Sequence, residues 1–366
     1  MKNRGLSLVL MGGLLAATGC ELPPVDTVAT GFRGTGMEHV SNPGTVADSM
    51  RAIAARIQPA SGTAPAAMEP APPGTWENVQ VLGHLSEAEF NRFMLNMTIW
   101  VAQGTGQGCN YCHVVDSEGV VDFVSDNIYT KVVSRDMISM TQDLNANWET
   151  HVGEAGVNCW TCHQGQALPT NYWFFADERR GALIQNFVNA PRQPERYLLD
   201  EEGVRVQSGA ALTADVDNPV STNDTRHAYW VMLQMTEALG VNCTYCHMSP
   251  RWGDWEESPP TRTTALRGVR MTRELNQSYM LPLQNAWPAE RLGPMGDGPK
   301  IQCATCHMGA YIPQYGHPAS HGQDHPAITQ IGFPHAGSPA PTMEMDPEAP
   351  PTGAAPGAAT TGAGMR

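Results

Sequence analysis

The chain has 366 residues, enough for two or three ordinary domains with a sizeable core. Asp and Glu outnumber Lys and Arg by 36 to 22, and the formal charge of −14 argues against nucleic acid as a partner, because polyanions attract basic surfaces. With 36 Gly, 29 Pro and only 16% charged residues, we expect much of the chain to be loop.

The first 19 residues are typical of a bacterial lipoprotein signal peptide. Lys2 and Arg4 form a basic start, an apolar run covers 6–15, and small residues precede Cys20. The apolar run is shorter than the ~20 residues that span a bilayer. We expect lipidation of Cys20, although residue 17 is Ala where such signals usually have Leu. An uncleaved anchor and plain secretion are the alternatives.

Composition divides the rest of the chain into five further segments. Pro-, Gly- and Ala-rich sequence at both ends predicts an extended N-terminal arm and a disordered C-terminal tail. The central part contains two halves joined by a connector. The expected segments are the arm at 20–75, the first half at 76–190, the connector at 191–222, the second half at 223–335 and the tail at 336–366.

Four stretches of apolar residues at helical spacing lie within the two halves. We expect helices at about 86–101, 127–148, 223–240 and 267–279. The first begins with a capping-box pattern from Ser86 to Glu89, and the third ends at Gly240. The words "MTQDLN" from Met140 and "MTRELN" from Met271 are alike, which indicates an internal repeat.

A cysteine motif follows each expected helix. Of nine cysteines, eight form C-x-x-C pairs, and every pair is followed at once by His. The motifs are Cys109 and Cys112 with His113, Cys159 and Cys162 with His163, Cys243 and Cys246 with His247, and Cys303 and Cys306 with His307. This spacing is that of covalent haem attachment, in which two thiols bind the haem vinyl groups and the adjacent imidazole binds the iron.

Other chemistries use paired cysteines, but they fit this pattern poorly. Zinc ribbons have no need of a His after each second Cys, and thioredoxin-like sites have one pair. Structural disulfides in exported proteins seldom come only at this spacing. We therefore predict four covalently bound haem c groups. The fold class is mainly α with long loops, a multihaem cytochrome c built from four helix–CxxCH repeats in two pseudo-symmetric halves.

Each iron needs a second axial ligand, and the repeats indicate where to find it. The first three helices each contain Met-x-x-Met, and residues three apart share a helix face, so one Met can bind iron while the other packs. The pairs are Met94 with Met97, Met137 with Met140, and Met232 with Met235. Simple core packing is the alternative for all six.

The fourth helix keeps only the second Met of the pair. Aligning Met271 with Met140 places Gly268 opposite Met137, so if the first Met is the ligand, a haem at the fourth motif lacks one of its own. His151 is the candidate donor, because it lies fourteen residues after Met137, or ~21 Å along a helix, too far for both to bind one iron. The other histidines outside the motifs are more typical of surface or packing residues.

Across about 76–315, the sequence resembles the tetrahaem cytochrome c subunit of photosynthetic reaction centres. The likeness depends on the four motifs and on several flanking words. These are "VLGHLSEAEF" at 81–90, "NWETHVGEAGVNCWTCH" at 147–163, "LGVNC" at 239–243 and "RGVRMTRELN" at 267–276.

The resemblance implies His/Met ligation of three haems and His/His ligation of the fourth. The implied pairs are Met94 with His113, Met137 with His163, Met232 with His247, and His151 with His307. Because the stretch after Trp100 is two residues longer than is typical, Met97 stays an alternative for the first haem. Arg262 matches an arginine of the family that raises the potential of the third haem.

The resemblance also implies a function without substrate chemistry. The subunit would lie on the periplasmic face of the inner photosynthetic membrane, anchored through lipidated Cys20 and bound to the reaction centre core subunits. It would re-reduce the photo-oxidised bacteriochlorophyll pair, with electrons from a soluble periplasmic donor such as a small cytochrome c or a high-potential iron–sulfur protein. The alternative is a multihaem redox enzyme or a respiratory electron carrier.

Overall fold

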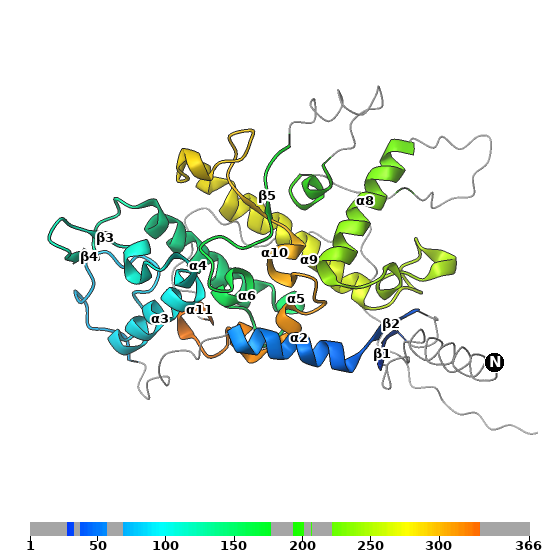
Figure 1. Ribbon diagram of the computed structural model, residues 1–366, viewed down its shortest axis with the longest axis horizontal. Helices are drawn as coiled ribbons and strands as arrows, with labels where there is room; N and C mark the ends of the chain where they lie inside the picture. The colour runs from blue at the N-terminus through cyan, green and yellow to red at the C-terminus, as the bar shows by residue number, and fades with distance from the viewer. Residues whose placement is uncertain are drawn as a thin grey trace, which may run out of the picture.

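The computed structural model describes residues 28–32, 37–56, 69–176, 193–200, 206 and 222–329. This part of the chain is mostly helical, with long loops and few strands, as expected (Figure 1). The signal peptide, Cys20 and the C-terminal tail lie outside the described residues, as do most of the expected connector and a part of the arm. None of the described helices has the length and apolarity that crossing a membrane requires.

The four expected long helices are all present, and the bounds of three are close to the expected ones. They are α3 (Glu87–Trp100), α4 (Tyr129–Asn147), α8 (Thr222–Leu239) and α9 (Thr261–Leu275). Helix α8 ends at Gly240, whose φ of 64° is one that glycine adopts without strain. Helix α9 begins six residues before the expected start, and a π-helical turn, Asn276–Met280, continues it.

Helix α3 shows how the expected capping box departs from the pattern. The Ser86 hydroxyl accepts a hydrogen bond from the Glu89 backbone N–H at 3.2 Å, as an N-cap does. The Glu89 carboxylate, however, binds Arg92 at 2.6 Å, and both side chains are buried. Glu89 is therefore part of a buried ion pair.

Two shorter helices, α6 (Cys159–His163) and α10 (Cys303–His307), are the second and fourth motifs themselves. Figure 1 shows them near the middle of the molecule, with α3 and α4 towards one end and α8 towards the other. Helix α5 (Glu149–Val152) carries His151 and contacts α9. The first and third motifs lie in short 3₁₀ turns, Gly108–Tyr111 (η2) and Cys243–Tyr245 (η4).

The described strands form three antiparallel pairs. Strands β3 (Val114–Val115) and β4 (Val121–Asp122) form a hairpin after the first motif. Strand β5 (Tyr172–Trp173) pairs with β6 (Lys300–Ile301), with Tyr172 opposite Ile301, so the chain after the second motif is joined to the chain before the fourth. Strands β1 (Val28–Phe32) and β2 (Met37–Ser41) form the remaining hairpin.

Part of the segment expected to be an extended arm has regular structure. Besides the β1–β2 hairpin it contains helix α2 (Pro43–Arg56). Pro43 suits the first turn of a helix, where a backbone N–H would have no partner, and the Asn42 side chain accepts from Gly44 N–H at 2.8 Å. Strand β2 contacts η4, so this hairpin lies against the third motif.

The residues after the fourth motif return to the first half of the chain. A segment at 313–329, ending in α11 (Pro326–Thr329), packs against α3, α4 and α6. The side chains of Gln142 and Asn145 donate to the carbonyls of Ala327 and Ile328 at 2.7 and 2.9 Å. Ala327 and Ile328 are fully buried beside Phe93 and Trp100, in the larger hydrophobic core.

Candidate functional site

The four motifs fall into two structural kinds. In the second, the Thr161 hydroxyl accepts from the backbone N–H of Asn158 at 3.0 Å and donates to the carbonyl of Ser320 at 2.8 Å. In the fourth, the Thr305 hydroxyl accepts from Gln302 at 3.0 Å and donates to the carbonyl of Asn171. These capping boxes form the short helices α6 and α10, each of which ends in a residue with φ near 50°.

The first and third motifs are held by the next helix along the chain. The Tyr111 carbonyl accepts from the Thr130 hydroxyl at 2.5 Å, and Thr130 lies in the first turn of α4. The Tyr245 carbonyl likewise accepts from Thr261, the first residue of α9. Each of these motifs is therefore fixed to the start of a long helix, whereas the second and fourth motifs are helices of their own.

Three of the four motif histidines present one ring nitrogen for metal binding. Nδ1 of His163, His247 and His307 lies 2.9 Å from the carbonyl oxygens of Gln166, Trp252 and Ala310, respectively. A hydrogen bond from Nδ1–H to a carbonyl fixes the tautomer in which Nε2 has a free lone pair, the arrangement of metal-binding histidines. The Nδ1 atom of His113 is buried without a hydrogen-bond partner among the described residues.

Burial also keeps these imidazoles neutral. It lowers the pKa of His113, His163 and His247, and it lowers the pKa of His307 to about 4. Because the neutral imidazole is the form that binds iron, the motif histidines are in the correct state near neutral pH.

The second Met of each pair contacts parts of the chain beyond its own motif. The Met97 sulfur lies 3.6 Å from the Cys159 sulfur of the second motif. Met235 lies in a small cavity beside Cys303 of the fourth motif. Met140 packs with Met271, its counterpart in the repeat, in a cluster around Leu144, Leu275 and Tyr279. Met97 and Met140 both also line the cavity of the second motif.

Met137 and His163 line one cavity. The same cavity contains the attachment cysteines Cys159 and Cys162, and most of its surface is apolar. Met94 is half-buried on α3, which contacts η2, and Met232 is half-buried on α8, which contacts η4. The structure therefore brings Met137 together with its expected partner, and it places Met94 and Met232 on helices that contact theirs.

His151 faces His307 across 6.2 Å between ring centroids. A metal–imidazole nitrogen bond is ~2 Å long, so this separation is about what one metal atom between two imidazoles requires. The Nδ1 atom of His151 lies 3.1 Å from the Thr264 carbonyl, as in the motif histidines. Burial lowers the pKa of His151, which keeps it neutral.

Gly268 makes room for His151. A Cβ atom added to Gly268 would lie 2.5 Å from Cε1 of the His151 ring and 3.0 Å from its Nε2. In the repeat, Gly268 corresponds to Met137. The His151 ring therefore occupies the space that a side chain at this position would fill.

Arg262 lies beside the third motif. Its guanidinium donates to the Asp254 carbonyl at 2.7 Å and to the Ser258 hydroxyl at 2.8 Å, and it stacks 3.8 Å above the Trp255 ring. After burial, the positive charge of Arg262 is a further cause of the lowered pKa of His247. This arginine is therefore close enough to influence a charged group at the third motif.

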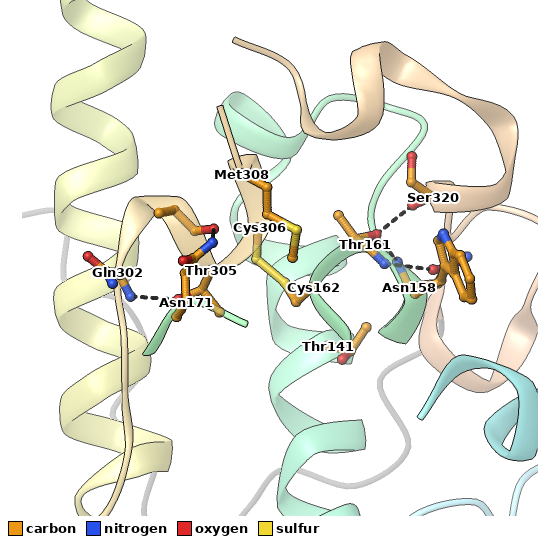
Figure 2. Close-up of a disulfide and its surroundings, with 12 residues drawn as sticks. Thr141, Asn158, Thr161, Cys162, Asn171, Gln302, Thr305, Cys306, Met308 and Ser320 are labelled. Carbon is orange, nitrogen blue, oxygen red and sulfur yellow. Dashed lines mark hydrogen bonds between the residues drawn. A yellow bond between two sulfur atoms is a disulfide. The ribbon is translucent and has the colours of Figure 1, made fainter. Parts of the chain in front are cut away.

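Cys162 and Cys306 form a disulfide, which joins the second cysteines of the second and fourth motifs (Figure 2). Their Cα atoms are 4.3 Å apart. A sulfur in a disulfide cannot also form a thioether bond to haem, so this disulfide and haem attachment at Cys162 or Cys306 exclude each other. For the site, the disulfide shows that the second and fourth motifs lie side by side. The other six motif cysteines are free thiols.

Several residues that the motifs require were missed by sequence reasoning. The hydroxyls of Thr130, Thr161, Thr261 and Thr305 hold the four motifs in place. A signal was present, because the second and fourth motifs have Thr before the second Cys, whereas the first and third have Tyr. Tyr129 and Arg291, which line the cavity of Met137, carry no such signal.

Paired thiols followed by a neutral, oriented imidazole, beside a Met or a second His, fit covalently attached haem and define the class of c-type cytochromes. Comparisons with known proteins specify the family. The family model described as the photosynthetic reaction centre cytochrome C subunit matches residues 21–329. This chain belongs to that family, and it is an electron-transfer protein with covalently bound haem c.

Individual relatives agree with the family model. The photosynthetic reaction center cytochrome c subunit of Rubrivivax gelatinosus is 41% identical over 337 residues, which cover 87% of each chain. Its namesake in Thermochromatium tepidum is 36% identical over 364 residues, or 94% of this chain and 85% of the relative. That of Roseobacter denitrificans is 40% identical over 262 residues, or 66% and 69%.

Proposed function

We propose that this chain carries four haems and re-reduces the photo-oxidised bacteriochlorophyll pair of a reaction centre. Electrons would come from a soluble periplasmic donor, and lipidated Cys20 would anchor the protein to the periplasmic face of the membrane. The observation that carries this proposal is the arrangement of the four motifs in one continuous row. Such a row suits electron transfer between haems, which needs no open substrate site.

Three contacts support the row. Tyr111 of the first motif lines the cavity that contains the second. The disulfide between Cys162 and Cys306 joins the second motif to the fourth. Tyr245 of the third motif lies 6.2 Å, between ring centroids, from Tyr311, just after the fourth. The order along the row is therefore first, second, fourth, third.

The paired local structures support two pseudo-symmetric halves of two repeats each. The first and third motifs are 3₁₀ turns bound to the next long helix, and the second and fourth are capped helices. Within this scheme each iron has a distal ligand. The proposed ligands are Met94, Met137, Met232 and, from the second repeat to the fourth haem, His151. A complete ligand set favours an electron carrier over an enzyme, which needs an open coordination site.

The ligand types predict an uneven set of potentials. Met raises the potential of a haem relative to His, so His/His ligation favours a low potential at the fourth haem. Arg262 would raise the potential of the third haem, because its positive charge disfavours the oxidised form. Burial and neighbouring charges also contribute.

Flash-induced absorbance changes in native membranes test the proposal. A flash should bleach haem of this protein in membranes washed free of soluble donor, because the third haem would lie at the end of the row nearest the pair. Met232→His should keep the third haem six-coordinate and lower its potential, which redox titration would detect. No haem bleaching after a flash would contradict the proposal, as would an unaltered titration of all haems in the variant.

A further inference from the structure

Arg291 and Tyr129 form a polar site in the cavity that contains Met137 and His163. Arg291 ends the 3₁₀ turn Ala289–Arg291 (η8), and Tyr129 is the first residue of α4. Both side chains are half-buried. The nearby Tyr129 hydroxyl raises the pKa of Arg291, which keeps this group charged.

Four of the other polar side chains of the cavity bind backbone carbonyls. The hydroxyls of Thr130, Ser134 and Thr141 donate to backbone carbonyls at 2.5, 2.7 and 2.8 Å. The amide of Asn158 donates to two carbonyls at 2.8 Å. Arg291 is thus the permanent positive charge among the described residues that line this cavity.

Arg291 also lacks an acidic partner within the described part of the chain. No Asp or Glu of that part lies within ion-pair distance of it, whereas Arg92, Arg135 and Arg196 each pair with a carboxylate at 2.6 to 2.8 Å. Tyr111 and Tyr129 line the same cavity as Arg291. A half-buried guanidinium without an acidic partner can bind a carboxylate, because its coplanar N–H groups match the two carboxylate oxygens.

Haem supplies such a carboxylate, because the macrocycle bears two propionates besides the two vinyl groups that the cysteines bind. We propose that Arg291, positioned by the Tyr129 hydroxyl, binds a propionate of the haem at the second motif and raises the potential of that haem. The proposal rests on the proposed attachment at Cys159 and Cys162. Neutralising a propionate removes a negative charge that stabilises the oxidised haem, so the reduced form is favoured.

Redox titration of the purified holoprotein in the dark tests this proposal. We compare the wild type with Arg291→Gln and Arg291→Lys, and Arg51→Gln is the control, because Arg51 is exposed and pairs with Asp48 at 2.5 Å. Arg291→Gln should move one reduction step to lower potential by about tenfold in its equilibrium constant, ~59 mV for one electron. Arg291→Lys should move the same step less, and the control should move none.

Two titration results would overturn the proposal: unchanged steps in Arg291→Gln, or an equally large shift in Arg291→Lys. Haem content of the same samples, from the pyridine haemochrome and the protein mass, tests the attachment separately. A wild type that lacks haem at the second motif would refute the attachment itself. If only Arg291→Gln lost haem, that variant could not report the potential of the second haem. Resonance Raman spectra of Arg291→Lys, which keeps the haem, would then decide, because a propionate bending band of one haem should shift. Unshifted bands would contradict the proposal.

Discussion

Gly268 and His151 are the residues on which the ligation of the fourth haem depends most directly. Gly268→Ala should expel the His151 ring, because the new Cβ would lie 2.5 Å from Cε1. We expect the haem at His307 to become five-coordinate and to bind carbon monoxide when reduced. Alanine favours helix over glycine by ~1 kcal/mol, so this loss cannot result from a weaker α9.

Gly83→Ala is a matched control for this prediction. A Cβ there would meet only the Val79 carbonyl oxygen, at 3.8 Å, an ordinary contact. This variant should bind no more carbon monoxide than the wild type. If the haem at His307 stayed six-coordinate and inert to carbon monoxide in Gly268→Ala as well, the assignment of His151 as its distal ligand would be wrong.

The candidate ligands stay predictions, made from sequence by comparing the helices before the four motifs with one another. The loss of a Met at Gly268 indicated a borrowed ligand, and His151 lay at a suitable distance in the sequence. The polar cavity residues Tyr129 and Arg291 could not be found in this way. They come from distant parts of the chain, and neither belongs to a repeated pattern.

Among the elements, the long helices could be predicted because their apolar residues recur at helical spacing. Helix α4 spans Tyr129–Asn147, close to the expected 127–148. The short helices of the second and fourth motifs depend on one threonine each, too little periodicity for prediction. The segment at 313–329 was also out of reach, because its polar contacts with the first half depend on the tertiary fold.

Gln314 provides a test of how this returning segment supports the second motif. Its side-chain oxygen accepts from the Trp160 indole N–H at 3.0 Å, and its amide donates to the Trp160 carbonyl at 3.3 Å. Both residues are buried. Gln314→Ala should lower the free energy of unfolding by about 1–3 kcal/mol, because the indole N–H would be buried without a partner.

Chemical denaturation followed by circular dichroism gives that free energy. Hydrogen exchange should also quicken in the peptide that contains Trp160. Gln323→Ala is the control, because Gln323 lies in the same segment with an exposed side chain. Equal stability of Gln314→Ala and the control would show that the Gln314 hydrogen bonds do not stabilise the second motif.

For the whole molecule, the positions of the motifs matter more than their order in the sequence. The fourth motif lies between the second and the third, because α6 and α10 are neighbours and α8 contacts α10. Figure 1 shows α3 and α8 on opposite sides of this central pair. Sequence comparison of the repeats predicted two halves, but it could not predict how they meet.

The central claim is that four haems in a row supply electrons to the photo-oxidised pair. A train of single-turnover flashes on membranes tests it, with all haems reduced beforehand, soluble donor removed and an oxidised quinone added as acceptor. Each of the first four flashes should be followed by rapid re-reduction of the pair and by the loss of one reduced haem. After the fifth flash the pair should stay oxidised. A pair that stays oxidised after the first flash, while the haems remain reduced, would contradict the account.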